Sequence, residues 1–354
     1  MAYTTIDNPE LFFQTVLWTG NATNARSITL DGSENMQPDW VWIKNRTDTN
    51  SHALFDSVRG ATKFIESDTT DAEATNSGFL QSFNSDGFTV GDQGRVNANS
   101  ENYVAWNWKA GTSFSNDASA TSVGTIDSTG SINTTAGFSI ISYTGNGTLG
   151  ATVAHGLGVA PSLVIVKRRD TTGNWWTYHS NLGGANKYIV LNSTSAAGTS
   201  TNIWNNTAPT STVFSLGDNS NYPEVNGTSN TFIAYCFAGK KGYSKFGSYK
   251  GNGNADGTFI YTGFLPAWIM VKPIDATQNW QIHDLKRLGY NITNKNLSSN
   301  STATEAENDF MDIVSNGFKI KRADVLNVSG DEYIYWAFAK APFTNSNGVP
   351  TNAR

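Results

Sequence analysis

Three degenerate copies of one unit, each about 100 residues long, run through the chain and constrain its fold more than any local pattern. The best-matching segment begins at a proline and ends at a lysine with the same spacing each time: Pro38–Lys44, Pro161–Lys167 and Pro266–Lys272. Internal repetition sets the architecture before any single element is assigned. A tandem display of modules also favours binding or structural work over a single catalytic pocket.

The segments around this strand recur in the same order. A Gly-Asn turn precedes it in each copy, because both residues tolerate positive φ. An aromatic strand closes each copy, and its mixture of aromatic and small residues predicts a strand buried on both faces. The turns are Gly20-Asn21, Gly145-Asn146 and Gly251-Asn252, and the closing strands are Tyr103–Trp108, Phe232–Phe237 and Tyr333–Phe338.

An Asp-x-x-Arg pair follows the lysine strand in copies one and three. The aspartate can accept backbone N–H bonds in a turn, and the arginine can clamp a carboxylate or a carbonyl group. We interpret the pair as structural, with a clamp for a ligand carboxylate as the alternative. The pairs are Asp56 with Arg59 and Asp284 with Arg287, and copy two is expected to have Ser180 and Gly183 in their places.

The composition predicts an all-β fold. Only 15% of the 354 residues are charged, and short β-branched and aromatic runs are separated by Gly, Asn, Asp and Ser. No long helical stretch is visible, and 12% aromatic residues suffice to build a core for each module. This pattern is typical of sandwich and jelly-roll modules. We therefore expect three tandem β-sandwich repeats of the jelly-roll or concanavalin-like kind.

The repeats divide the chain into six parts. We expect copies two and three to pack together, because few residues join them, and copy one to stand apart on a flexible or extended linker. The parts are an N-terminal arm (1–10), β-sandwich repeat 1 (11–110), a Gly/Ser/Thr-rich linker (111–136), β-sandwich repeat 2 (137–240), β-sandwich repeat 3 (241–343) and a polar tail (344–354).

Charge, hydropathy and cysteine content exclude several classes of function. The net charge is −5 and the basic residues are scattered, so nucleic-acid binding is not expected. The chain has no apolar run long enough to cross a membrane and no recognisable signal peptide. Its single cysteine, Cys236, rules out an intrachain disulfide and is interpreted as a small buried hydrophobe. These features indicate synthesis in a reducing cytosol.

Catalytic and metal-binding patterns are missing from the sequence. The four histidines form no Ser/His/Asp motif and no metal-ligand spacing, so we expect no enzyme activity, no metal and no cofactor. The segment Asn252–Gly257 imitates half of an EF-hand loop but has Gly263 where the bidentate glutamate belongs. A looser calcium site in this loop stays open as an alternative. Carboxylates that meet only in space, as in glycoside hydrolases, also stay open.

Sugar binding is the site-level activity that the sequence favours. Aromatic faces stack on the C–H faces of sugars, while polar side chains bond to the hydroxyls. The candidates are aromatic residues in or beside polar segments, although ordinary core packing is the competing interpretation of each. They are Trp175, Trp176, Trp204, Tyr222 and Trp280.

Several motifs together resemble a known family. The opening Met1–Asp7, the stretch Gly137–Asn146, the turn His155–Pro161 and the strand Tyr103–Lys109 are similar to virion structural proteins of marine tailed bacteriophages. Those repeat-containing proteins are often described as tail-fibre, LamG-like or of unknown function. The resemblance covers nearly the whole chain and implies a particle component near the host-contacting surface. It identifies no functional residue.

The repeats and the resemblance lead to three hypotheses. The favoured one is a tail fibre, spike or other appendage that binds host cell-surface glycan, with many weak sites acting together. The alternatives are a purely structural head-decoration, knob or tail-scaffold protein and, last, a glycan depolymerase. The expected partners are other virion proteins and further copies of the chain, with a homotrimer favoured. Phe12 and Phe13, near the arm, are the candidates for attachment to the virion.

Overall fold

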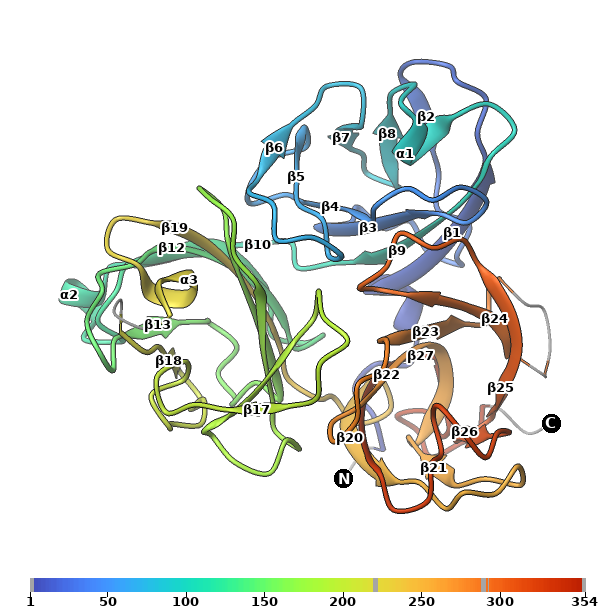
Figure 1. Cartoon of the computed structure of the whole chain (residues 1–354). Helices are drawn as coiled ribbons and strands as arrows, with labels where there is room; N and C mark the ends of the chain where they lie inside the picture. The colour runs from blue at the N-terminus through green and yellow to red at the C-terminus, as the bar shows by residue number, and fades with distance from the viewer. Residues whose placement is uncertain (1–2, 219–221, 288–290, 292, 352–354) are drawn as a thin grey trace.

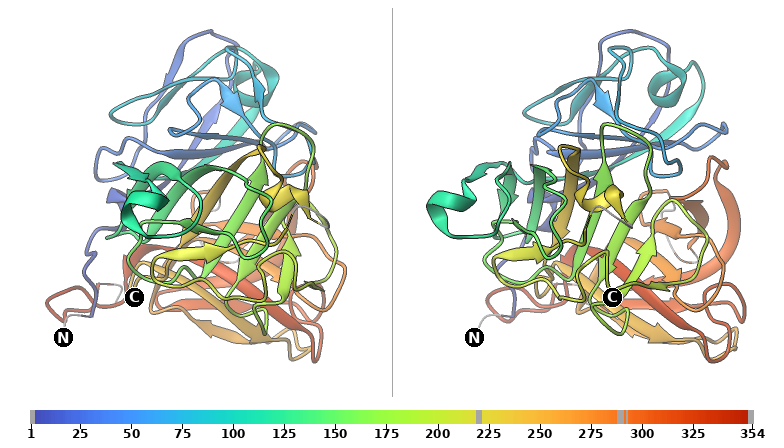
Figure 2. Two further views of the ribbon diagram at one scale, coloured as in Figure 1. Left: turned by 90° about the vertical axis from the view of Figure 1, so that its left-hand side faces the viewer. Right: turned by 60° about the vertical axis from the view of Figure 1, so that its left-hand side comes forward.

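A computed structural model describes residues 3–218, 222–287, 291 and 293–351. Within these residues the protein is all-β, with antiparallel sheets and only three four-residue α-helices. The strands form three lobes around one centre (Figure 1). We call them lobe 1 (13–108), lobe 2 (112–237) and lobe 3 (244–342). Figure 2 shows lobe 1 in blue above lobes 2 and 3, so the lobes do not lie in a straight row.

Each lobe contains the same four-stranded arrangement, in which the closing aromatic strand lies between the strand that precedes the Gly-Asn turn and the lysine strand. The order in lobe 1 is β1 (Phe13–Thr19), β9 (Asn102–Trp108), β3 (Trp40–Asn45), β4 (Ala53–Asp56). The order in lobe 2 is β12 (Phe138–Thr144), β19 (Thr231–Phe237), β14 (Leu163–Arg168), β15 (Trp175–His179). The order in lobe 3 is β20 (Ser244–Lys250), β27 (Glu332–Pro342), β22 (Phe264–Pro273), β23 (Gln281–Asp284).

The remaining strands complete each lobe in a different way. Lobe 1 adds a sheet of β2 (Arg26–Ile28), β8 (Phe88–Val90) and β7 (Leu80–Phe83), and the pair β5 (Lys63–Phe64) and β6 (Ala74–Thr75). Lobe 2 adds β10 (Thr112–Asn116), β11 (Ser128–Asn133), β16 (Lys187–Val190) and β17 (Gly198–Thr199), and the pair β13 (Thr152–Ala154) and β18 (Val213–Ser215). Lobe 3 adds β24 (Thr293–Ser298), β25 (Ala306–Val314), β26 (Gly317–Ile320) and β21 (Phe259–Tyr261). The short helices are η1 (Pro9–Leu11), α1 (Gly94–Asn97), α2 (Ala118–Thr121) and α3 (Pro223–Asn226).

The central strands are buried on both faces, as their sequences predict. Trp40 and Trp42 of β3 point toward the centre of the molecule, whereas Val41 and Ile43 between them point into the core of lobe 1. This double burial explains the nearly continuous apolar runs of these strands.

The three lobes share one aromatic core, which we call the central core. Trp40 of lobe 1 stacks on Tyr235 of lobe 2, with ring centroids 4.5 Å apart. Trp108 of lobe 1 lies 5.6 Å from Phe338 of lobe 3, and that ring lies 5.7 Å from Phe237 of lobe 2. The expectation that copy one stands apart is therefore wrong, because its aromatic side chains are buried against both other lobes.

The segment 111–136 is not a linker. Its residues form β10, α2 and β11, and these strands extend the sheet of lobe 2 through the pairing of β11 with β12. Asp117 caps α2 by accepting hydrogen bonds from the backbone N–H groups of Ser119 and Ala120. The prediction failed because short edge strands of Ser, Thr and Gly have the composition of a flexible connection.

The N-terminal arm and the polar tail both lie against the body. Ile6 is 3% exposed and belongs to the central core, and Thr4 is also buried. The tail turns back on itself, since the backbone N–H of Asn345 donates to the carbonyl oxygen of Val349. Ser346 then bonds to the carboxylate of Asp7, which joins the two ends of the chain.

Candidate functional site

The tryptophans predicted to bind sugar are buried, which corrects that prediction. Trp175 is 0% exposed and Trp280 is 2% exposed, and both belong to the central core. Their indole N–H groups donate to backbone carbonyl oxygens of a neighbouring lobe, at Glu66 and Val190. A ring enclosed on both faces has no surface for a sugar.

The other three predicted residues lie in lobe 2 and do not form a binding face. Trp176 and Trp204 are buried in the core of that lobe. The half-buried ring of Tyr222 packs edge-on against Trp176, with the centroids 5.1 Å apart. The Trp176 indole N–H donates to the Glu224 carboxylate over 2.8 Å. The five predicted residues are thus distributed over two separate cores.

The phenylalanines predicted to attach the protein to a virion are also engaged internally. Phe13 is 2% exposed and stacks on Phe338 with a centroid distance of 5.3 Å. Phe12 is half-buried and lies edge-on to Tyr243 at 6.0 Å. Phe13 therefore has no free face for a virion contact, whereas attachment through the half-buried Phe12 stays a prediction.

The calcium-like loop is held by side-chain hydrogen bonds. Asn327, which is fully buried, donates to the side-chain oxygen of Asn252 and accepts from its backbone N–H. Asp256 pairs with the ammonium group of Lys319. Among the described residues no three His, Cys, Asp or Glu side chains meet as a group that could hold a metal ion.

Asparagines hold the corresponding turns of the other lobes in the same way. Asn97 accepts a hydrogen bond from the backbone N–H of Asn21, and Asn226 accepts one from that of Asn146. The three Gly-Asn turns of the repeat are therefore structural elements.

The repeated lysine is the residue that links the lobes. The Lys44 ammonium donates to the carbonyl oxygen of Thr302 in lobe 3 over 3.0 Å. Lys167 donates to Thr70 of lobe 1 over 3.0 Å, and Lys272 donates to Thr194 of lobe 2 over 3.1 Å. Each lobe thus holds a loop of another lobe, and the three contacts form a closed ring.

Burial lowers the pKa of each of these lysines to about 8. A lysine with a lowered pKa is a candidate nucleophile. Here each side chain is 0% exposed and donates to two or more backbone carbonyl oxygens. A buried ammonium with these bonds is a structural clamp, because no substrate can approach its nitrogen.

The loops that accept these bonds contain a motif that sequence reasoning missed. It reads Asp/Asn, Ser/Thr, Thr, two variable residues and then Glu/Ala, and it lies between the lysine strand and the closing strand of each copy. The third residue of the motif is a threonine in every copy, and its backbone carbonyl oxygen accepts the hydrogen bond from the lysine. A search for spacing shared among these loops would have found it at 68–73, 192–197 and 300–305.

Buried ion networks accompany the lysine contact at two of the three seams between lobes. At the seam of lobes 1 and 2, Glu73 pairs with Arg59 of its own lobe and with Arg169 of lobe 2. Arg59 in turn pairs with Asp56, and both side chains are fully buried. The Asp-x-x-Arg pair is therefore part of a link between lobes.

The same network recurs between lobes 3 and 1. Glu305 pairs with Arg287 and with Arg46 of lobe 1, and Arg287 pairs with Asp284. Neighbouring positive charges keep the pKa of Glu305 below its usual value although burial opposes them.

The seam between lobes 2 and 3 replaces this network by weakly polar and apolar residues. Strand pairing shows that His179, and not the predicted Ser180, is the counterpart of the two aspartates. His179 lies opposite Leu163 in lobe 2, just as Asp56 lies opposite Trp40 in lobe 1. Leu182 then takes the place of the arginine, and the pair Ala197 and Ile274 replaces the outer Glu-Arg pair. A backbone hydrogen bond joins this pair across the seam: the N–H of Ala197 donates to the carbonyl oxygen of Ile274 over 2.7 Å.

The aspartates also bind the central core. The Asp56 carboxylate accepts from the hydroxyl of Tyr235 over 2.7 Å, and Asp284 accepts from the indole N–H of Trp106 over 3.0 Å. At the corresponding place the indole N–H of Trp336 has no partner in the structure. His179 stands in the place of the carboxylate that would accept a hydrogen bond from this indole N–H.

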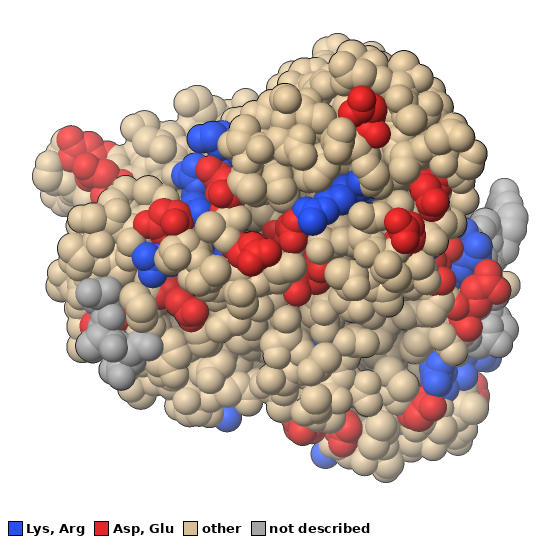
Figure 3. Space-filling model, turned by 45° about the horizontal axis from the view of Figure 1, so that its top comes forward, with Lys and Arg blue, Asp and Glu red and all other residues tan. Residues whose placement is uncertain are grey.

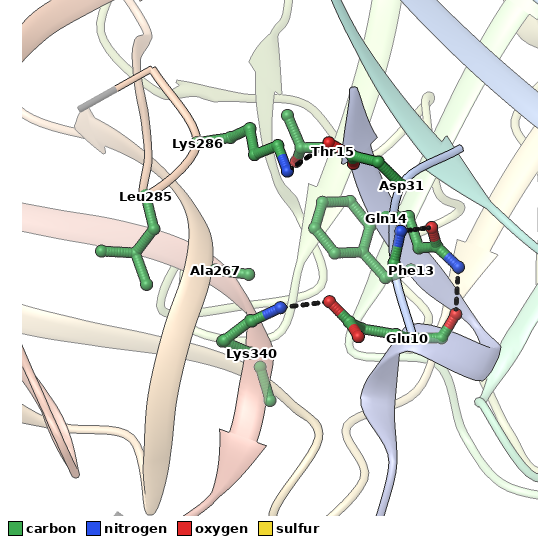
Figure 4. A pocket seen from close by; sticks show the side chains of 11 residues that line it. Glu10, Phe13, Gln14, Thr15, Asp31, Ala267, Leu285, Lys286 and Lys340 are labelled. Carbon is green, nitrogen blue, oxygen red and sulfur yellow. Dashed lines mark hydrogen bonds and ion pairs between the residues drawn. The ribbon is translucent and has the colours of Figure 1, made fainter. Parts of the chain in front are cut away.

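A cavity of about 220 Å³ lies between the N-terminal segment, lobe 1 and lobe 3 (Figure 4). Lys286 and Lys340 of lobe 3 reach across it to Asp31 and Glu10. Each charge at its rim is therefore paired. On the face drawn in Figure 3, acidic and basic side chains are interspersed without a large area of one sign.

Exposed aromatic rings occur together on β21. Phe259 is 46% exposed and Tyr261 is 47% exposed, while Ile260 between them is buried. Alternate residues of a strand share a face, so the two rings lie on the same side of β21. This pair is the most exposed aromatic surface among the described residues.

The described residues contain no helix that is long and apolar enough to cross a membrane. No curated protein and no solved structure matches the chain. One family model does match it, over residues 8–342, which span all three lobes from η1 to the last residue of β27. The chain therefore belongs to the family described as a domain of unknown function, DUF7483.

Proposed function

We propose that this protein is a structural component of a bacteriophage particle, without catalytic activity, and that it acts as one rigid three-lobed body. The observation that carries the proposal is the closed ring of lysine contacts around the central core. Each lobe is held by both others, so none can move without breaking buried hydrogen bonds. The resemblance of the sequence to virion proteins of tailed bacteriophages supports the assignment to a particle.

The distribution of ionisable groups supports a role without catalysis. All four histidines of the chain are buried: His52, His155, His179 and His283. The lysines with the lowest pKa values are enclosed at the seams. General acid–base chemistry needs such groups within reach of a substrate.

The finer architecture belongs to the same proposal. We propose that each lobe is a β-sandwich of the jelly-roll or concanavalin-like kind. In support, the four-stranded sheet of lobe 1 and the sheet of β2, β8 and β7 enclose a core of their own. Lobes 2 and 3 likewise enclose cores of their own, which are distinct from the central core that all three lobes share.

The experiment is to purify particles from a lysate in which this chain is produced and to locate the chain by cryo-electron microscopy. The proposal expects the chain at a fixed copy number, with density for all three lobes in one arrangement. Its absence from purified particles would overturn the proposal. The homotrimer stays a prediction, and a measurement of the mass in solution tests it. The aromatic core shared by three repeats already forms within one chain.

Binding of host-surface glycan is the second candidate function. The specific observation that favours it is the exposed pair Phe259 and Tyr261 on a strand of a rigid body. These rings replace the buried tryptophans as candidates for stacking on sugars.

A further inference from the structure

We propose that Tyr3, Phe259 and Tyr261, together with Lys241 and Lys245, form a binding site for an acidic glycan, whose sugars carry carboxylate or sulfate groups. We call these five residues the aromatic–lysine surface. The inference deepens the second candidate function, glycan binding, and rests on it. Its ligand class follows from the two kinds of side chain that meet there.

Two of the three aromatic residues of this surface, Tyr3 and Tyr261, are joined by a hydrogen bond. The hydroxyl groups of Tyr3 and Tyr261 lie 2.9 Å apart in a hydrogen bond, and the Tyr3 hydroxyl also donates to the carbonyl oxygen of Gly263. Tyr3 comes from the N-terminal arm and Tyr261 from β21, so two distant segments build one surface. Exposed rings with fixed orientation offer flat apolar faces to the C–H groups of a sugar at low cost in side-chain entropy.

Lysines lie over the faces of two of these rings. The Lys241 ammonium lies 4.5 Å from the centroid of the Tyr3 ring, and that of Lys245 lies 5.4 Å from the centroid of Tyr261. Such cation–π contacts hold the ammonium groups beside the rings without neutralising them.

The charge of this surface is not compensated within the described residues. No carboxylate of that part of the chain forms a salt bridge with Lys241 or Lys245, whereas the neighbouring Lys319 pairs with Asp256. Two positive charges that no described carboxylate neutralises, beside exposed rings, complement a polymer that has both apolar sugar faces and negative groups. A neutral glycan would use the rings and leave the lysines without a partner.

The surface is also rigid. β20 and β21 are the two outer strands of the eight-stranded order of lobe 3. Side chains join them, because Lys245 donates to the carbonyl oxygen of Tyr261 and Thr258 donates to that of Lys250. A preformed surface loses little entropy when it binds a ligand.

The test measures binding of the full chain to defined probes by isothermal titration calorimetry. The probes are a heparin oligosaccharide, which is sulfated, and an alginate oligosaccharide, which is carboxylated, with a dextran oligosaccharide as the neutral comparison. We expect the wild-type protein to bind one or both acidic probes more tightly than dextran, with an affinity that falls as salt is added. Equal or tighter binding of dextran, or no binding of either acidic probe, would overturn the proposal.

Two variants separate the contributions. F259A/Y261A is expected to weaken binding of the acidic probe about tenfold or more, because it removes the stacking faces. K241Q/K245Q is expected to keep the rings but to remove the preference for acidic over neutral probes. The matched controls are Leu149→Ala and Lys187→Gln, which lie in lobe 2 and are expected to bind as the wild type does. Unchanged binding in both surface variants would contradict the site.

Two further measurements separate a glycan from a membrane or a virion protein as the ligand of this surface. Binding to vesicles that contain phosphatidylglycerol, without binding to the acidic oligosaccharides, would show that the surface recognises a membrane and would overturn the proposal. Incorporation of F259A/Y261A into particles separates this inference from the structural role. We expect wild-type incorporation of that variant, since the rings lie outside the central core; its loss would identify the surface as a virion contact and overturn the glycan site.

Discussion

The ammonium nitrogen of Lys167 lies 3.0 Å from the carbonyl oxygen of Thr70, although 97 residues separate them in the chain. The same lysine also donates to the carbonyl oxygen of Gly173 in its own lobe over 2.9 Å. One buried side chain thus fastens a loop of lobe 1 to a loop of lobe 2. Lys44 and Lys272 make the equivalent contacts at the other seams, and this ring of contacts makes one body out of three repeats.

Replacement of Lys167 by methionine is expected to destabilise the protein by about 1–2 kcal/mol at neutral pH, because Gly173 loses the donor to its buried carbonyl group. Urea unfolding measures the change. The matched control is Lys250→Met at an exposed position of β20, which is expected to cost less than about 0.5 kcal/mol. Equal stability of K167M and the wild type would contradict the structural role.

The stability of the wild-type protein is expected to rise between pH 8 and about pH 10 because of the three repeated lysines. Burial lowers their pKa to about 8 in the folded protein, whereas the unfolded chain has the usual value near 10.5. In this window the unfolded chain binds more protons, so raising the pH favours the folded state. Urea unfolding at several pH values measures the rise. K167M, which keeps two of the three lysines, is expected to show about two thirds of this rise in stability. If K167M and the wild type had the same pH profile, Lys167 would not be one of the groups responsible.

Replacement of Glu73 by alanine is expected to cost about 3 kcal/mol, because it leaves the Arg169 guanidinium without its carboxylate partner in a largely buried seam. The double variant E73A/R169I recreates the Ala197 and Ile274 pair of the third seam. It is expected to be at least about 1 kcal/mol more stable than E73A alone. Glu34→Ala, at an exposed position, serves as the control in the same urea titrations. A double variant less stable than E73A would show that the two kinds of seam are not interchangeable.

The protein is expected to lose stability as the pH falls from about 6.5 toward 3, in part because of His52. Its Nδ1 accepts from the indole N–H of Trp42 over 2.8 Å, and its Nε2–H donates to the carbonyl oxygen of Ser298. Burial lowers the pKa of His52 to about 3, and the charge of Lys44 adds to this effect. The unfolded chain therefore binds a proton in this window that the folded protein does not.

The variant His52→Gln removes this group. Between pH 6 and pH 4 its stability is expected to depend on pH by about 1.4 kcal/mol per pH unit less than that of the wild type, which corresponds to one proton. His179 and His283, whose pKa values burial lowers to about 4 and about 3, and His155, whose pKa burial also lowers, contribute to the remaining dependence. Parallel profiles of variant and wild type would exclude His52 as the group responsible.

Cys236 is expected to be unreactive in the folded protein. Its side chain is 0% exposed, and burial raises the pKa of the thiol to about 12, so almost no thiolate is present at pH 8. Ellman's reagent is expected to detect no thiol in the native state and one thiol per chain in guanidinium chloride. Rapid reaction of the native protein would mean that β19 opens readily.

Much of the fold follows from the sequence, because the repeat and the alternation along single strands are local properties. The equal spacing from Pro38 to Lys44 and its two counterparts marks the same strand in each lobe. The aromatic closing strands are buried on both faces, as their pattern indicates. The edge strands β10 and β11 escaped prediction, since polar residues at the edge of a sheet and in a flexible connection have the same composition.

The sequence by itself determined the repeated central strands, their double burial and the threefold repetition. Only the tertiary structure decided which aromatic residues are available to a ligand. Trp175 and Tyr261 both lie near polar segments, yet one is enclosed between lobes and the other is 47% exposed. Exposure depends on which lobe covers a strand, and this depends on long-range contacts such as that of Lys167 with Thr70. A pattern within one segment carries no information about such distant neighbours.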